Sequence, residues 1–269
     1  MHKTSPNQQR YLKTLKRQKQ SVIFARVLLF AAFFLLWETA SGLGWIDSFV
    51  FSSPSRVAAA FRRMTEDGSL FLHIGVTLAE TLLSFFLVIL FSLLSAVLLW
   101  LFPKLSLILE PYLVVLNSLP KSALAPLLIV WLGANMSTIV VAGISVAIFG
   151  AILNLYTGFT EVSPEKLKLI YTLHGTKKDA LFKVILPGTV PNIISIMKVS
   201  IGLCLIGVII GEFISSRQGL GYLIIYGSQV FQLDLVILSI LILCVIAAGL
   251  YAVIALLEKA VTVSHFPKR

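Results

Sequence analysis

Long runs of apolar residues, separated by short polar segments, dominate the pattern of this chain. A helix that crosses a bilayer needs about 20 mostly apolar residues, because the hydrocarbon core is about 30 Å thick and each residue rises about 1.5 Å. Six stretches meet this requirement: Phe24–Leu43, Leu78–Phe102, Tyr112–Leu132, Thr138–Gly158, Ile193–Ile214 and Leu235–Leu257. Strands of a membrane barrel are shorter and alternate with period 2. The pattern therefore predicts an all-α, polytopic membrane protein with about six transmembrane helices.

Lysine and arginine are unevenly distributed between the segments that separate these runs. With the N-terminus inside, the inner segments hold 16 of the 22 basic residues and the outer segments hold 4. Inner loops carry the excess of Lys and Arg in membrane proteins. The bias predicts a cell membrane protein with both termini in the cytoplasm. It also divides the chain into a basic cytoplasmic tail over residues 1–21 and a transmembrane domain over residues 22–269.

Two of the connecting segments are long enough to have structure of their own. The outer one contains a short helical pattern over Ser55–Met64 with a serine at its start. In the inner one, from Phe159 to Pro191, Ser163-Pro164-Glu165 is typical of a helix start, with proline in the first turn and an acid near the positive end of the dipole. Polar residues with interspersed apolar ones follow. Pro187 and Pro191 predict a break before the fifth span, so we expect a pair of amphipathic cytoplasmic helices here.

Composition supports the same conclusion. Hydrophobic residues make up 58% of the chain and charged residues 13%, about half the share of a soluble domain. The net charge of +10 does not indicate nucleic-acid binding, because the basic clusters fill the gaps between apolar runs instead of forming a folded basic face. Cys204 and Cys244 lie within apolar stretches and fit small hydrophobic fillers rather than a disulfide framework.

The chain lacks the motifs of several kinds of chemistry. It has no G-x-x-x-x-G-K-[ST] phosphate loop, no H-E-x-x-H, no G-x-S-x-G and no Cys/His cluster. The apolar spans hold no catalytic pair at helical spacing. We therefore expect neither an enzyme nor a bound cofactor or metal, and any energy source has to come from a partner.

A set of short motifs lies in a particular order and spacing between about Ser53 and Glu258. They are Ser53-Pro54-Ser55 with Val57, Pro120, Ala125-Pro126-Leu127, Trp131-Leu132-Gly133, Phe182–Pro187 with Pro191, Gly211-Glu212-Phe213, Gly219–Tyr222 and Asp234. In this order and spacing the sequence resembles a known family, the permease subunits of binding-protein-dependent ABC importers. The resemblance is to the type I branch that handles nitrate, taurine, aliphatic sulfonates and thiamine-precursor pyrimidines.

The resemblance implies that residues 159–191 contain a coupling helix, which docks on an ATPase subunit. The positions that it assigns to coupling are Lys168, Tyr171, His174, Gly175, Thr176 and Pro187. The family pattern is Glu-Ala-Ala, three residues, Gly, and about a dozen residues to Leu-Pro. Here Lys168, Leu169 and Ile170 replace the first three, and His174 stands at the glycine position with Gly175 one residue later. The alternative is a basic loop that lies on anionic headgroups.

Three polar residues in or near the spans are candidates for a substrate pathway. Lys121 lies between two prolines in the third span, either facing a pathway or anchoring the span at the interface. Asn154 in the fourth span either contacts substrate or hydrogen-bonds between helices. Glu212, near the outer end of the fifth span, either lines the pathway or pairs with Arg217.

As a permease of this family, the chain would form a pore with a second copy or a homologue. Two ATP-binding subunits would dock on the cytoplasmic side, an extracytoplasmic solute-binding protein would deliver a small solute, and transport would proceed by alternating access. The solute would be an anion such as sulfonate, taurine or nitrate, or a thiamine-precursor pyrimidine. Two alternatives remain: an ion-coupled secondary transporter, which the lack of a visible repeat disfavours, and an intramembrane enzyme, which the missing catalytic pairs disfavour.

Overall fold

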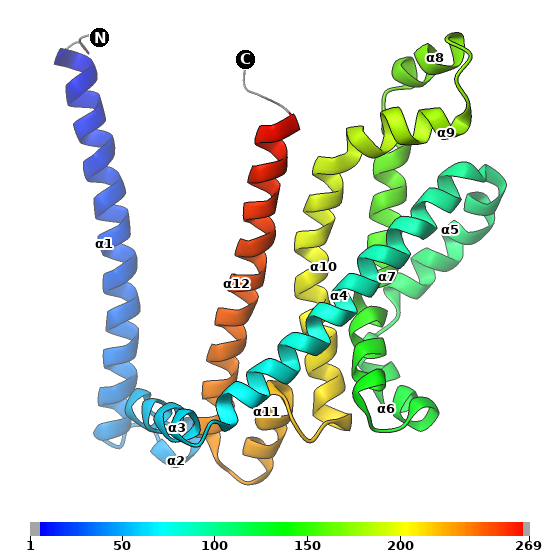
Figure 1. Cartoon of the computed structure of the whole chain (residues 1–269). Helices are drawn as coiled ribbons and strands as arrows, with labels where there is room; N and C mark the ends of the chain where they lie inside the picture. The colour runs from blue at the N-terminus through cyan, green and yellow to red at the C-terminus, as the bar shows by residue number, and fades with distance from the viewer. Residues whose placement is uncertain (1–5, 266–269) are drawn as a thin grey trace.

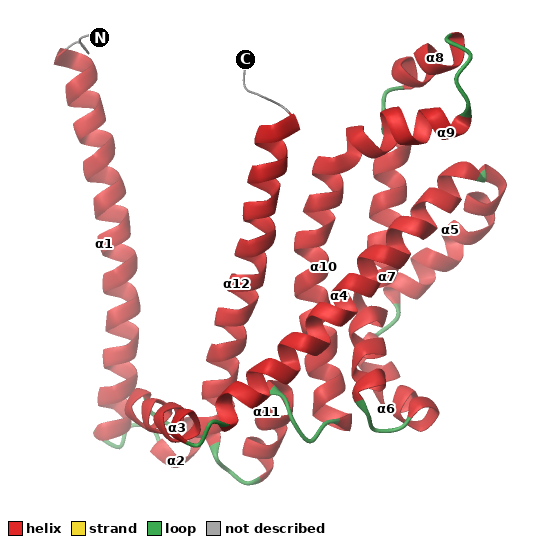
Figure 2. Ribbon diagram, in the orientation of Figure 1, coloured by secondary structure: helices red, strands yellow, loops and turns green. Residues whose placement is uncertain are grey.

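The computed structural model describes residues 6–265, and within them the chain forms helices joined by short loops (Figures 1 and 2). No strand occurs in this part, which confirms the all-α prediction. The elements are α1 (Pro6–Gly42), α2 (Ser48–Phe51), α3 (Pro54–Glu66), α4 (Ser69–Leu101), α5 (Pro103–Ser118), α6 (Lys121–Leu132), α7 (Met136–Thr160), α8 (Pro164–Thr172), α9 (Lys177–Ala180), the π-helical turn η1 (Leu181–Ile185), α10 (Leu186–Ser215), α11 (Leu220–Gln229) and α12 (Leu233–His265).

Five helical stretches are long and apolar enough to cross a membrane. They lie at Gln20–Gly42, Ser69–Leu101, Met136–Thr160, Lys177–Ser215 and Leu233–Ala260. The pair formed by α5 and α6 meets the same criterion when the two helices are taken together. The prediction of about six apolar spans is therefore confirmed, with one of them broken.

The third predicted span is not the single helix that we expected from Tyr112 to Leu132. It is divided between α5 and α6, whose axes differ by 96°. Leu119 is extended, with φ −63° and ψ 141°, as expected for a residue that precedes a proline, because the proline ring disfavours the helical region there. Pro120 therefore ends α5 and turns the chain into α6.

The expected break at Pro187 and Pro191 is absent. The chain stays helical from Lys177 to Ser215, with Pro187 in the first turn of α10 and Pro191 inside the helix. The π-helical turn η1 directly precedes Pro187. A π-turn re-spaces the backbone hydrogen bonds, so the prolines are accommodated next to it and α9 passes into α10 without a loop.

Helix α1 is set apart from the other spanning helices (Figure 1). It begins at Pro6, so the described part of the predicted tail continues the first span as one helix. None of its span Gln20–Gly42 is buried within the chain. Its contacts lie near its end, where Trp37 Nε1 donates to the Phe51 carbonyl at 3.3 Å and the Ser55 amide donates to Glu38 at 3.0 Å.

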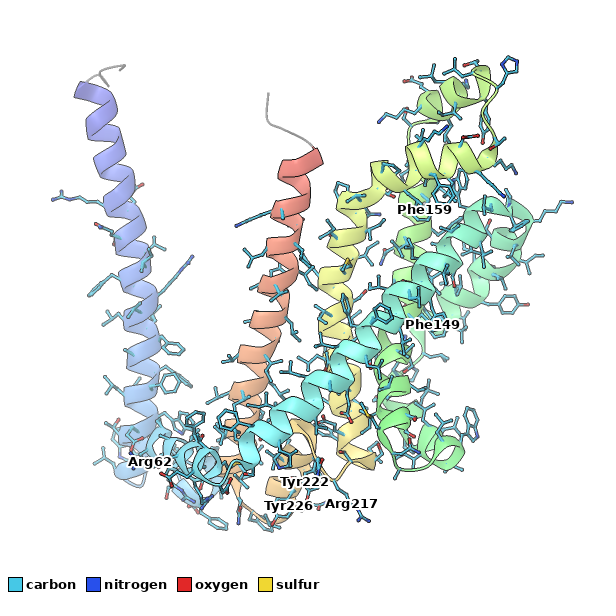
Figure 3. The ribbon with its side chains drawn as sticks, viewed as in Figure 1. Arg62, Phe149, Phe159, Arg217, Tyr222 and Tyr226 are labelled. Atoms are coloured by element: carbon cyan, nitrogen blue, oxygen red, sulfur yellow. The ribbon has the colours of Figure 1, made fainter. Side chains whose placement is uncertain are left out.

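The centre of the molecule is formed by α4, α7 and α10. Gly207 and Gly211 of α10 face Ala142 and Ile139 of α7, and a Cβ atom at Gly207 would lie 2.8 Å from the Ala142 carbonyl. The spacing G-x-x-x-G allows two membrane helices to approach closely. Farther along α7, Phe159 is buried against η1, and Figure 3 labels its ring at the end of α7. Helix α10 is therefore packed firmly on α7.

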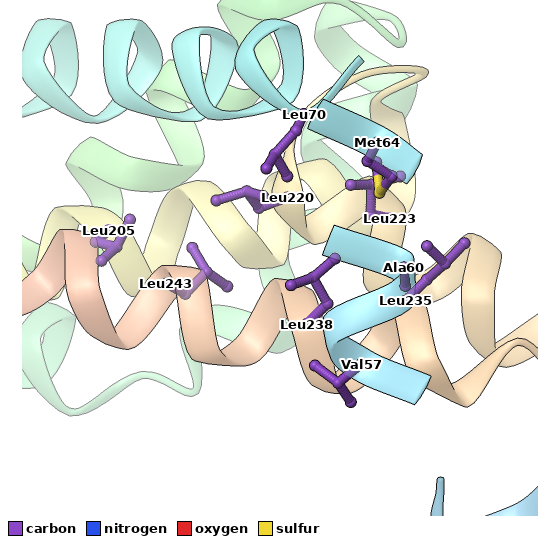
Figure 4. Packing of buried hydrophobic residues seen from close by; sticks show 10 residues of the cluster. All are labelled: Val57, Ala60, Met64, Leu70, Leu205, Leu220, Leu223, Leu235, Leu238 and Leu243. Atoms are coloured by element: carbon purple, nitrogen blue, oxygen red, sulfur yellow. The ribbon is translucent and has the colours of Figure 1, made fainter. Parts of the chain in front are cut away.

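A second core lies at the opposite end, where α3 and α11 pack across the starts of α4 and α12 (Figure 4). Its buried members are Val57, Ala60, Met64, Leu70, Leu205, Leu220, Leu223, Leu235, Leu238 and Leu243. The predicted short helix is present as α3, but it begins one residue before Ser55, and its N-cap is Ser53, which accepts a hydrogen bond from the Arg56 amide. Arg56 pairs with Asp234 at 3.1 Å and so ties α3 to α12.

The described ends of α1 and α12 lie at the same end of the molecule as α8 and α9 (Figure 1). The elements α2, α3, α6 and α11 lie at the other end. We call these the α8–α9 end and the α3–α11 end.

Candidate functional site

Helix α8 lies at the surface of the α8–α9 end, with only Leu167 packed in part against the core that includes Phe159, and it begins as the sequence predicts. Pro164 stands in its first turn and Glu165 is the first acidic residue. No residue of α8 is buried. Its apolar side chains include Leu169, which is 60% exposed, and Leu173 directly after it, which is 71% exposed. Exposed apolar side chains on a polar segment are typical of a surface that a partner covers.

A tight turn connects α8 to α9 and depends on two residues. His174 has a φ of 59°, in the left-handed region that few residues other than glycine adopt. The Gly175 amide donates to the Ile170 carbonyl at 2.9 Å. A Cβ atom at Gly175 would lie 2.8 Å from that carbonyl oxygen, so only glycine fits. The turn thus uses both positions, the left-handed one at His174 and the crowded one at Gly175.

The start of α9 is fixed by a capping box. The Thr176 hydroxyl accepts from the Asp179 amide at 3.2 Å, and the Asp179 carboxylate accepts from the Thr176 amide at 2.9 Å. Lys183 pairs with the same carboxylate at 2.8 Å. Beyond the cap, Leu181 and Ile185 are buried against the core that includes Phe159. The exposed α8 is therefore linked to α10 through an ordered, anchored α9.

Replacing Thr176 by alanine should remove about 1 kcal/mol of capping stability from α9. Amide hydrogen exchange at residues 179–181 is then expected to accelerate about fivefold. Thr172→Ala is a matched control, because Thr172 is exposed and bonds only to carbonyls of its own helix. Equal exchange rates in the two variants would show that the capping box does not hold α9.

The structure brings together five of the six predicted coupling residues. Lys168, Tyr171, His174, Gly175 and Thr176 lie within α8 and its turn at the α8–α9 end. Pro187 lies apart, in the first turn of α10.

The three predicted pathway residues lie in three different places. Lys121 begins α6 at the bend after Pro120, and its ammonium group donates to the Asn117 carbonyl. Asn154 lines a pocket of about 400 Å³ between α7 and α10, together with Asn192. Asn192 packs over Gly158, where any Cβ atom would overlap its amide. Glu212 is buried, with 1% of its surface exposed.

Glu212 organises a turn at the α3–α11 end. Its carboxylate accepts from the Thr77 hydroxyl at 2.6 Å and from the Gly221 amide at 2.5 Å. The Thr77 hydroxyl in turn accepts from the Leu220 amide at 2.8 Å, and His73 Nδ1 accepts from the Gly219 amide at 3.0 Å. Three successive amides at the start of α11 are thereby held by α4 and α10. No ion pair between Glu212 and Arg217 occurs in the described residues.

Two polar residues that line pockets between the helices, Glu80 and Asn192, were not among the predicted site residues. Glu80 lies in the second apolar span and is 2% exposed, and a carboxyl group inside such a span was the available signal. Asn192 follows Pro191 and lies just before the span predicted from Ile193. Because it fell outside that predicted span, it was not considered as a polar residue within the membrane.

The comparisons with known proteins agree with this geometry. Residues 88–263 match the family model described as binding-protein-dependent transport system inner membrane component. A probable ABC transporter permease protein of Haemophilus influenzae is 32% identical over 225 residues, which cover 84% of this chain and 91% of the relative. A Bacillus subtilis protein named for aliphatic sulfonate transport, SsuC, is 28% identical over 87% of this chain and 84% of its own length.

The fold is also similar to that of a solved structure, the MetNI methionine ABC transporter in an inward-facing conformation. The TM-score is 0.62 at 17% identity, and the match covers 71% of this chain and 94% of the other. This likeness confirms the expected type I importer permease fold. The family match covers well over half of the chain, and the predicted resemblance is confirmed. The chain therefore belongs to the family of binding-protein-dependent ABC transporter permeases, the inner membrane components of these importers.

Proposed function

We propose that this permease moves a small solute inward by alternating access. Transport would be driven by ATP, which two separate subunits docked at the α8–α9 end would bind. A homodimer would form the pore, and a solute-binding protein would dock at the α3–α11 end. The observation that carries the proposal is the α8–α9 segment, an exposed helix with uncovered leucines on an ordered linkage to α10. A surface built in this way fits docking into a groove of a partner.

The linkage suggests how motion would be transmitted. Leu181 and Ile185 are buried against Phe159 of α7, and η1 passes into α10 without a loop. A displacement of α8 by the ATP-binding subunits would therefore move α7 and α10 as a rigid body, rather than being absorbed by a flexible connection.

Charge and position together support the proposed orientation. The basic excess of the inner segments predicts that α8–α9 and both termini are cytoplasmic. The described ends of α1 and α12 lie at the α8–α9 end, as this topology requires. We propose a small anion or a thiamine-precursor pyrimidine as the cargo.

Cysteine labelling tests the orientation. In a chain with Cys204 and Cys244 replaced by alanine, Lys168→Cys reports on α8 and Gln218→Cys on the opposite end; both native positions are exposed. A membrane-impermeant maleimide should label Gln218→Cys from outside intact cells, and Lys168→Cys only in inverted vesicles. Labelling of Lys168→Cys in intact cells would exclude an ATPase at α8–α9 and overturn the proposal.

A further inference from the structure

A pocket between α7 and α10 reaches from the middle of α10 to the α8–α9 end. It has a volume of about 400 Å³, and its lining extends from Leu203 of α10 to Glu161, directly after α7. A second pocket of about 290 Å³ shares Gly158, Glu161 and Asn192 with it and continues to Lys166 of α8. The first pocket alone lies within the size range of small-molecule sites.

The walls of this pocket are polar, although both helices are long apolar spans. Asn154 and Thr157 of α7 line it, together with Asn192, Ser195 and Ser200 of α10. None of these five side chains takes part in a hydrogen bond within the described residues, and Ser200 lacks a partner although it is only 2% exposed. Hydroxyl groups elsewhere in the spans instead donate to a carbonyl of their own helix, as those of Ser145, Thr189, Ser215 and Ser239 do.

Lipid is a poor cover for such a wall. Asn154, Thr157 and Ser195 are exposed in the single chain. Polar side chains at membrane depth face the protein interior or a water-filled cavity, because hydrocarbon offers them no hydrogen bonds. In the proposed homodimer this wall would therefore line the aqueous pathway, where its unused donors and acceptors are available to a solute.

The two asparagines bring two amide groups close together on this wall. The Asn192 amide packs over Gly158, which lies four residues after Asn154 and therefore one turn farther along the same face of α7. Ser195 follows one turn after Asn192 on α10. The centre of the pocket is thus formed by amide and hydroxyl groups from both helices.

These groups carry no charge. Among the described residues that line this first pocket, Glu161 alone is charged, and it lies at the α8–α9 end. An anion would therefore find no counter-charge between Asn154 and Ser200. A side-chain amide both donates and accepts, so it pairs best with a solute edge on which an N–H donor lies beside an acceptor, as asparagine does with the amino group and ring nitrogen of adenine.

We propose that the pocket between α7 and α10 binds a neutral heterocyclic solute through Asn154 and Asn192, at an edge where an amino group adjoins a ring nitrogen. This inference rests on the proposed import function and narrows its cargo. Of the two proposed classes it favours an aminopyrimidine, which has such an edge, over nitrate, whose oxygens only accept hydrogen bonds.

Binding of simple probes to the purified full-length permease tests the site. The probes are 4-aminopyrimidine, which has the complete edge, pyrimidine, which lacks the donor, and sodium nitrate. The readout is the concentration dependence of the melting temperature in detergent. Wild type is expected to bind 4-aminopyrimidine about tenfold or more tightly than pyrimidine, and nitrate should stabilise it no more than sodium chloride does. Asn154→Leu, at an exposed position, should weaken binding of 4-aminopyrimidine about tenfold or more.

Asn192→Leu should weaken this binding to the same extent, so a folding defect in one variant leaves the other to decide. Gln229→Leu is the matched control, because it removes an exposed amide at the α3–α11 end and should keep wild-type affinity. Wild-type affinity in both asparagine variants, equal affinity for the two heterocycles, or no stabilisation of wild type would overturn the proposal. Because this measurement uses no ATP-binding subunit, its failure is distinguishable from failure of the import function, which the labelling and uptake experiments test.

Discussion

Replacing Leu173 by aspartate is expected to reduce ATP-dependent uptake at least tenfold while the permease remains folded in the membrane. Leu173 is 71% exposed directly after α8, so no packing within the chain is lost. A truncated or charged residue at the centre of an interface typically costs 2 kcal/mol or more of binding free energy, about a thirtyfold change. Uptake into proteoliposomes and co-purification of the ATP-binding subunits should fall together.

Thr172→Asp is the matched control. It introduces the same charge one residue earlier, at an exposed polar position of α8, and should leave uptake within about twofold of wild type, as expected for the rim of an interface. If Leu173→Asp retained both uptake and its ATP-binding partner, the α8–α9 end would not be the docking surface.

Replacing Gly207 by leucine is expected to destabilise the permease by about 3 kcal/mol or more. A Cβ atom there would lie 2.8 Å from the Ala142 carbonyl and from Gly143 Cα, and 2.9 Å from Val146 Cγ2. Because two of these atoms are backbone, α7 and α10 have to separate to admit the side chain. The melting temperature in detergent should fall by about 6 °C or more.

Gly202→Leu provides the comparison for this effect. Gly202 lies on the same helix, but a Cβ atom there meets nothing within 4 Å. The control should therefore melt close to wild type, or slightly above it, since leucine is the better helix former. Similar losses in both variants would mean that helix propensity, and not the approach of α7 to α10, explains the destabilisation.

The spans and the start of α8 were predictable because they depend on local rules. Apolar length fixes a membrane helix whatever it packs against, and Ser163-Pro164-Glu165 favours a helix start by itself. The bend at Leu119 also follows from a local rule, because a residue before proline disfavours the helical conformation. The hydropathy pattern does not reveal this bend, since both helices belong to one apolar run. The continuity through Pro187 was not predictable in this way, because it depends on the π-turn η1, which is stabilised by burial of Leu181 and Ile185.

The polar sites were harder to predict because they depend on which helices meet. Thr77 and Glu80 lie three residues apart in α4, yet the Thr77 hydroxyl donates to Glu212 and accepts from the Leu220 amide, while Oε2 of Glu80 is buried without a partner in the hydrogen-bond network of the described residues. Nothing in the local sequence distinguishes them. Lys121, Asn154 and Glu212 were each recognised as polar residues in or near apolar spans, but their positions at three separate places follow only from the tertiary arrangement.

The isolation of α1 has a consequence for how the protein is made. Helix formation in the bilayer and association of the helices are separate stages for a membrane protein. Over Gln20–Gly42, where nothing is buried within the chain, α1 completes the first stage and takes almost no part in the second. At most of its apolar positions, α1 therefore requires only sufficient hydrophobicity and length, and not a particular side-chain shape. Substitutions among Leu, Phe, Val and Ile should accumulate there faster during evolution than in α7 or α10.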